Sequence, residues 1–129
     1  MTDEELVRAF ESTDLPAEQF PHREHVRVAW WYLRQHPIGE AIVRFSAALR
    51  RFAVAKAVPD LYHETITIAF LLVIAERLGQ DDARALEWTT FATRHADLLT
   101  WKPSVLSRYY TDDLLFSDRA KRGFVMPYR

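Results

Sequence analysis

Residues 60–79 read DLYHETITIAFLLVIAERLG, and this stretch in the middle of the chain decides the fold. It holds an uninterrupted apolar run of eight residues, Ile68 to Ala75, and is apolar on nearly every side from Ile66 onward. Asp60 and Gly79 are suitable residues for the two ends of a helix, with Gly79 at the position that favours a left-handed conformation. A helix without a polar face belongs inside a protein, so we expect this one in the middle of a helical bundle.

The segments on both sides of this stretch have helical spacing. Residues 21–36 begin with Pro21 and are stopped by Pro37, as helices often are. Residues 38–57 carry one apolar stripe, typical of an amphipathic helix. A further helix is expected to start at Asp81 or Asp82 and to run to residue 99.

Shorter helices are expected near the two ends of the chain. Thr2 and Glu5 form a capping-box pattern for a helix ending near residues 11–14, and shorter helical segments are expected at 104–110 and 117–123. No stretch alternates with period two for long enough to predict a strand. The prediction is an all-α single domain, residues 1–129, with four longer helices in a bundle and short helices at each end.

Composition excludes several classes of function. The chain has 129 residues, 49% of them hydrophobic, which is enough for one core. Lys+Arg 17 against Asp+Glu 18 gives a net charge of −1, which argues against nonspecific binding to nucleic acid or to an anionic membrane. The absence of cysteine excludes a disulfide framework and a thiol nucleophile, and 3 Gly are too few for a glycine-rich phosphate loop.

The start of the chain has no basic segment followed by an apolar run, so no secretory signal is expected. An apolar run of eight residues is far shorter than the about 20 residues that a membrane span requires. We therefore expect a cytoplasmic protein.

The histidines are the most informative polar residues. On a helix starting at Pro21, His22 and His25 fall within the apolar arc, and His63 lies on the apolar side of the central helix beside Glu64. Both pairs lie near helix starts, where the positive potential of the helix dipole favours neutral imidazole. If the two helix starts pack together, these four residues converge on one polar pocket at one end of the bundle.

A pocket of this composition predicts binding of a small molecule or of a divalent metal. As an enzyme it would use Glu64 as the general base, with a pKa raised by burial, and His63 as its catalytic partner, in hydrolysis or proton transfer. His22, His25 and His63 would hold the metal ion. His22, His25 and Tyr109 would contact the ligand.

The alternative is a helical module without catalytic activity that acts by association. Buried histidines are often purely structural, with their ring nitrogens paired. Trp31 lies opposite the apolar stripe of its helix among charged residues, so either another element covers it or it marks an interface, for which a homodimer is the obvious candidate.

Three stretches carry a resemblance: FPHREHVRVAWWYL at 20–33, YHETITIAF at 62–70 and LLFSDRAKRGFVMP at 114–127. In this order and spacing they resemble a family of small, functionally uncharacterised bacterial proteins. The resemblance implies an all-helical, single-domain bacterial protein. It supplies no activity and no role for any residue.

Overall fold

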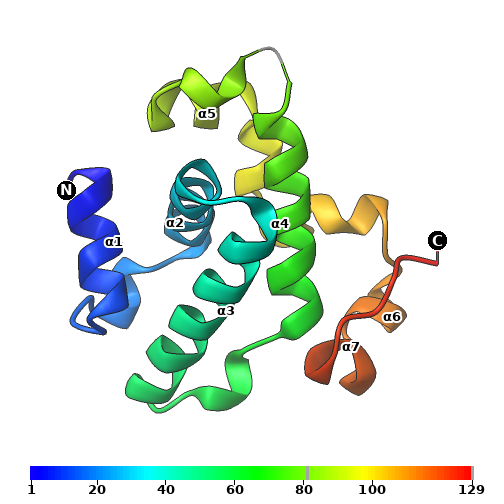
Figure 1. Ribbon diagram of the computed structural model, residues 1–129. Coiled ribbons are helices and arrows are strands. Elements are labelled where there is room, and N and C mark those ends of the chain that lie inside the picture. Colours follow the sequence, from blue (N-terminus) through cyan, green and yellow to red (C-terminus); the bar gives the residue numbers. More distant parts are fainter. Residues whose placement is uncertain (81, 129) are drawn as a thin grey trace.

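The computed structural model describes residues 1–80 and 82–128, and every regular element in them is helical (Figure 1). This confirms the all-α prediction. The α-helices are α1 (Asp3–Glu11), α2 (His22–Gln35), α3 (Ile38–Ala55), α4 (Glu64–Leu78), α5 (Trp88–Arg94), α6 (Asp112–Leu115) and α7 (Asp118–Arg122). Single 3-10 turns lie between them: η1 (Ala17–Gln19), η2 (Pro59–Leu61), η3 (Ala83–Ala85), η4 (Ala96–Leu99) and η5 (Val105–Arg108).

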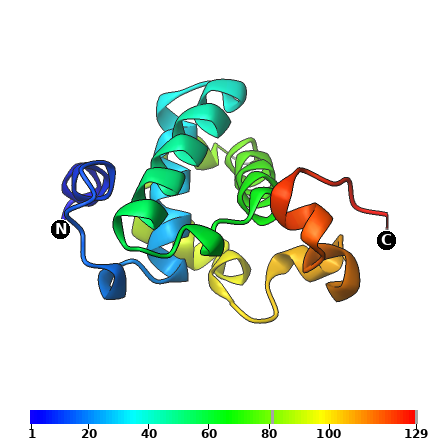
Figure 2. The same ribbon diagram turned by 90° about the horizontal axis from the view of Figure 1, so that it is seen from below.

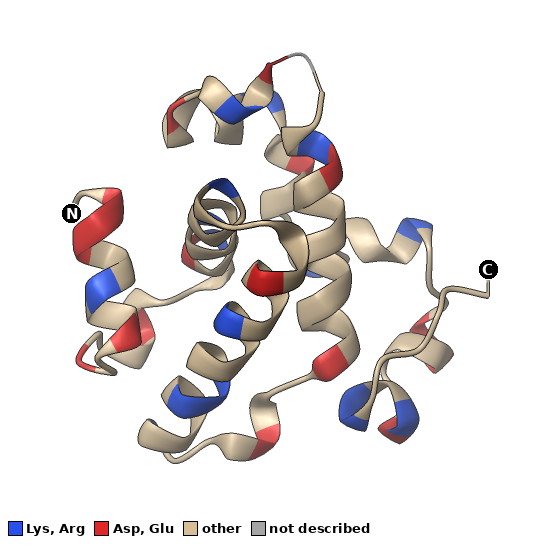
Figure 3. Cartoon of the chain, in the orientation of Figure 1, with Lys and Arg blue, Asp and Glu red and all other residues tan. Residues whose placement is uncertain are grey.

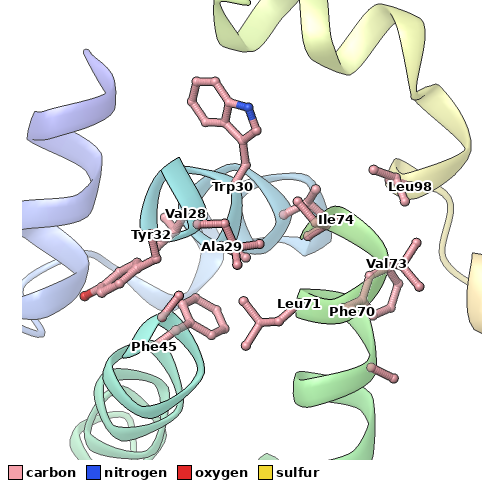
Figure 4. Packing of buried hydrophobic residues seen from close by; sticks show 14 of the residues in the cluster. Val28, Ala29, Trp30, Tyr32, Phe45, Phe70, Leu71, Val73, Ile74 and Leu98 are labelled. Carbon is pink, nitrogen blue, oxygen red and sulfur yellow. The ribbon is translucent and has the colours of Figure 1, made fainter. Parts of the chain in front are cut away.

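Helix α4 is the central element, as its sequence predicts. It packs against α2, α3 and α7, and its charged residues lie only at its two ends (Figure 3). In Figure 4 the side chains of Ala29 from α2, Phe45 from α3, and Leu71 and Ile74 from α4 point toward one another. The buried side chains of the described residues belong to one cluster built around these three helices.

The two ends of α4 differ in detail from the prediction. Asp60 lies in η2, and the N-cap of the helix is His63, three residues later. The ring of His63 accepts a hydrogen bond from the backbone N–H of Ile66. Gly79 ends the helix with φ −80°, so no left-handed residue is used there. The predicted capping box of Thr2 and Glu5 in α1 is present.

Helix α3 ends in a Schellman motif, which places the next residues beside the core. The N–H of Val58 bonds to the carbonyl of Ala53, and the N–H of Ala57 bonds to that of Val54. Ala57 adopts φ 61°, in the left-handed region where a Cβ atom is unfavourable. The chain therefore reverses sharply after Lys56 and enters η2.

The prediction of one long helix from Asp81 or Asp82 to residue 99 is wrong. Asp81 lies outside the described residues, and Asp82 has a left-handed φ of 55°. The segment forms η3, α5 and η4 instead, because tertiary bonds attach both of its ends to other helices. The Arg84 guanidinium donates to the carbonyl of Leu33 at the end of α2, and Asp97 accepts two hydrogen bonds from Arg77 of α4.

The packing of α2 on α4 also differs from a simple up-and-down bundle. In Figure 1 α2 is seen nearly along its axis whereas α4 runs vertically, so the two helices cross rather than run parallel. The end of α3 and the start of α4 nevertheless lie at the same end of the molecule, which Figure 2 shows from below. Within the described part of the chain, no helix combines the length and apolar character needed to cross a membrane.

Candidate functional site

A cavity of about 440 Å³ lies between α2, α3 and α4 at this end of the molecule. Fourteen of its twenty lining residues are apolar, so it is a mainly apolar cavity rather than the polar pocket that the sequence predicted. The six polar residues that line it are His22, His25, Lys56, Tyr62, His63 and Thr67. The three predicted histidines therefore meet at one cavity.

His22 contributes one unused hydrogen-bond acceptor to the cavity wall. Its Nε2 lies 2.9 Å from the carbonyl oxygen of Leu98, and since a carbonyl can only accept, Nε2 carries the proton. Burial lowers the pKa of His22, partly opposed by this hydrogen bond, so the ring is neutral near pH 7. Its Nδ1 is then an acceptor, with no hydrogen-bond partner among residues 1–80 and 82–128. The rings of Phe70 and Trp101 flank it, with centroids at 5.0 and 5.4 Å.

His25 lies one turn further along α2 and is stacked on Phe20, with ring centroids 4.0 Å apart. Burial, reinforced by the neighbouring His22, lowers the pKa of His25 to about 4, and an interaction with the backbone of Phe20 only partly offsets this. His25 is only partly buried, and it is one of the residues that line the cavity. His25 is therefore also a neutral imidazole on the cavity wall.

His63 has a structural role that uses both ring nitrogens. Nε2 donates to the carbonyl of Leu115 at 2.8 Å, and Nδ1 accepts the N–H of Ile66 at 3.1 Å. Burial lowers the pKa of His63, which favours this neutral form. Both ring nitrogens therefore take part in hydrogen bonds to the backbone. The catalytic role of His63 stays a prediction.

Glu64 does not reach the cavity. Its Oε1 accepts hydrogen bonds from Arg50 at 3.0 Å and from the Tyr62 hydroxyl at 2.5 Å, and its side chain is 22% exposed. The expectation of a general base placed this carboxylate in the pocket, raised in pKa by burial, and did not identify which groups would pair with it. Both partners lie on neighbouring segments that the helical pattern around Glu64 does not reveal.

Two further predicted residues also lie outside the cavity lining. Tyr109 is exposed, at the end of η5, so the predicted contact with a ligand in the cavity is not formed. Trp31 is half-buried and packs against the core, with its ring edge-on to Tyr32 at 5.4 Å. The homodimer interface at Trp31 stays a prediction.

The predicted metal site at His22, His25 and His63 is not formed. His63 has no free nitrogen, and His22 offers only Nδ1. In the described residues no group of three or more His, Asp or Glu side chains is arranged to hold a metal ion.

Sequence reasoning missed several residues that form the mouth of the cavity. Val58, Leu61 and Trp101 are exposed apolar side chains at its rim, and Lys56 stands beside them. In the sequence Lys56 is one of several basic residues in a single segment, so its helical position alone gives no signal. It reaches the cavity because the end of α3, of which Lys56 is the C-cap, packs beside the starts of α2 and α4.

Comparisons with protein-family models, with curated proteins and with solved structures gave no match for this chain. The resemblance to a family of small bacterial proteins is therefore neither supported nor opposed by them.

Proposed function

We propose that this protein binds an apolar small molecule that carries one hydrogen-bond donor, in the cavity between α2, α3 and α4. The observation that carries the proposal is the mainly apolar cavity of about 440 Å³ with two neutral histidines on one wall. Sites for small molecules are typically apolar clefts of roughly 300–1,000 Å³ with a few polar groups that fix the orientation of the ligand.

The size of the cavity argues against a packing defect. A space of about 440 Å³ is far larger than the ~150 Å³ engineered apolar cavity that accommodates benzene. Protein interiors are otherwise close-packed, so we infer that the space is kept for an occupant.

His22 supplies the main specificity in this proposal. Its Nδ1 faces a hydroxyl or similar donor on the ligand, because the proton of the neutral ring is held on Nε2 by Leu98. An acceptor that a bound ligand removes from water without offering it a donor is unfavourable by about 1–3 kcal/mol. A ligand with a donor at this position removes that cost. Catalysis by Glu64 and His63 is not part of the proposal, since their polar atoms are already paired.

Filling the cavity tests the proposal. We would measure the binding of 1-naphthol by equilibrium dialysis to the wild type and to Ala53→Phe, which adds a ring to the cavity wall. We expect at least tenfold weaker binding with an unchanged or higher melting temperature, because the new ring occupies the void. Ala47→Phe, on the exposed side of the same helix, is the matched control and should bind like the wild type. Equal binding by the two variants, or no binding by the wild type, would contradict the proposal.

The role of His22 is tested with two probes of nearly equal shape, 1-naphthol and 1-methylnaphthalene. The wild type should prefer the naphthol, and His22→Phe should remove the preference while keeping the affinity for methylnaphthalene. A preference that survives in His22→Phe would show that another group makes the hydrogen bond.

A further inference from the structure

Lys56 holds a positive charge at the rim of the cavity. It is the C-cap of α3, and its Nζ donates to the carbonyl of Thr13 at 3.0 Å and lies 5.3 Å from the centre of the Phe52 ring. The carbonyl belongs to the chain that follows α1, so Lys56 is attached to a second segment rather than free in solvent. The ammonium group has two further N–H donors.

This charge lacks an anionic partner in the described part of the chain. Arg27, Arg44, Arg50, Arg77 and Arg108 each form an ion pair with a carboxylate. Lys56 is half-buried, and among residues 1–80 and 82–128 no carboxylate pairs with it. Charges withdrawn from water are normally paired, because their desolvation is otherwise uncompensated.

Lys56 is also the lone Lys, Arg, Asp or Glu among the described residues that line the cavity. Glu18 and Asp60 belong to the turns beside the mouth, but both are exposed and neither lines the cavity. With the three histidines neutral, the cavity wall carries a single formal charge, and that charge is positive.

The cavity extends inward from Lys56 as an apolar space. It is lined by α3 from Phe45 to Lys56 and by α4 and its cap from His63 to Ile74. Each of these spans is twelve residues, and its first and last residues lie about 16 Å apart along a helix at 1.5 Å per residue. Phe45 and Ile74, at one limit of the lining, are buried and lie in the core (Figure 4), whereas Leu61 is 75% exposed.

From this arrangement we propose that the occupant is an organic monocarboxylate, with its carboxylate bound by Lys56 at the mouth and its apolar body extending toward Phe45 and Ile74. This inference rests on the proposed function and names its class of ligand. The carboxylate accepts the two free N–H groups of Lys56 and supplies the missing negative charge. A hydroxyl or comparable donor on the body of the ligand would meet Nδ1 of His22.

The test compares acids with alcohols of matched shape. Competition with bound 1-naphthol would be measured for 1-naphthylacetate and 2-(1-naphthyl)ethanol, and for decanoate and 1-decanol, at pH 7.5 and low salt. In the wild type we expect each acid to bind about tenfold more tightly than its alcohol, as for a charge-assisted hydrogen bond in a partly buried site. Lys56→Gln should abolish this preference and leave the affinity for the alcohols unchanged. Lys102→Gln is the control, since that ammonium lies over Phe116 at 4.1 Å rather than on the cavity wall, and it should keep the preference.

The outcomes separate this inference from the proposed function. If 1-naphthol binds but neither acid is preferred over its alcohol, the monocarboxylate assignment is overturned and the apolar binding site stands. The same conclusion follows if Lys56→Gln keeps the preference. If 1-naphthol itself does not bind to the wild type, both proposals fail.

Discussion

Replacing Thr65 by valine should detach the C-terminal segment from α4. The Thr65 hydroxyl is fully buried, donates to the carbonyl of Gly123 at 3.0 Å and accepts the N–H of Val125 at 3.1 Å. One hydroxyl therefore satisfies two backbone groups of a segment that lies about 60 residues further along the chain. Valine has nearly the same shape but can make neither bond.

The magnitude follows from what is left unpaired. The N–H of Val125 is buried, so leaving it without an acceptor should destabilise the folded protein by about 1–3 kcal/mol. Gly123 is only half-buried, so water can replace part of its bond. We expect Thr65→Val to lower the free energy of unfolding by about 2–3 kcal/mol, or roughly 4 °C in melting temperature for each kcal/mol.

Thr67→Val is the matched control on the same helix. Thr67 is 7% exposed, and its hydroxyl donates at 2.7 Å to the carbonyl of His63, which also accepts the backbone N–H of Thr67. That carbonyl stays paired after the substitution, so the loss should be below about 1 kcal/mol. Urea denaturation of both variants checks the difference. Equal destabilisation of the two variants would refute the reasoning.

Three further predictions concern the ends of the helices and the cavity. Because burial lowers the pKa of His25 to about 4, the unfolded chain binds this proton more readily. The free energy of unfolding should therefore fall by up to about 3 kcal/mol between pH 6.5 and pH 4; His25→Phe should remove this part of the pH dependence in urea titrations, and His36→Phe should not. Asp97→Asn should destabilise by about 1–2 kcal/mol in thermal unfolding at pH 7, since it weakens the paired hydrogen bonds from Arg77, with the partial exposure of Asp97 limiting the effect. Ala57→Gly should raise the free energy of unfolding by about 0.5–1 kcal/mol, and with it the melting temperature, because glycine adopts the left-handed φ of 61° without strain. A lower melting temperature would contradict this.

The sequence predicted well what depends on local apolar pattern. The run from Ile68 to Ala75 identified the central helix, and the helical phase of His22, His25 and His63 placed all three on inward faces that meet at one cavity. Long apolar patterns are reliable because the burial of a whole helical face outweighs local preferences.

The features that the sequence did not predict depend on contacts between residues far apart along the chain. Glu64 is turned away from the cavity by Arg50, and the expected helix from residue 82 to 99 is divided by bonds to α2 and α4. Val58 and Leu61 reach the rim of the cavity only through a turn that needs an alanine in a left-handed conformation, which no sequence rule favours. The neutral, paired state of His63 likewise depends on the carbonyl of Leu115.

The placement of Trp101 has a spectroscopic consequence. Trp30 and Trp88 are buried in the core and Trp31 is half-buried, whereas Trp101 is exposed at the mouth of the cavity with its ring 5.4 Å from that of His22. Indole emission shifts to the blue when water leaves the ring, and a protonated imidazole nearby quenches it. The long-wavelength part of the intrinsic fluorescence therefore comes largely from Trp101. A molecule that enters the cavity and displaces water from this ring should shift the emission to the blue, so the emission wavelength reports filling of the cavity without any added label.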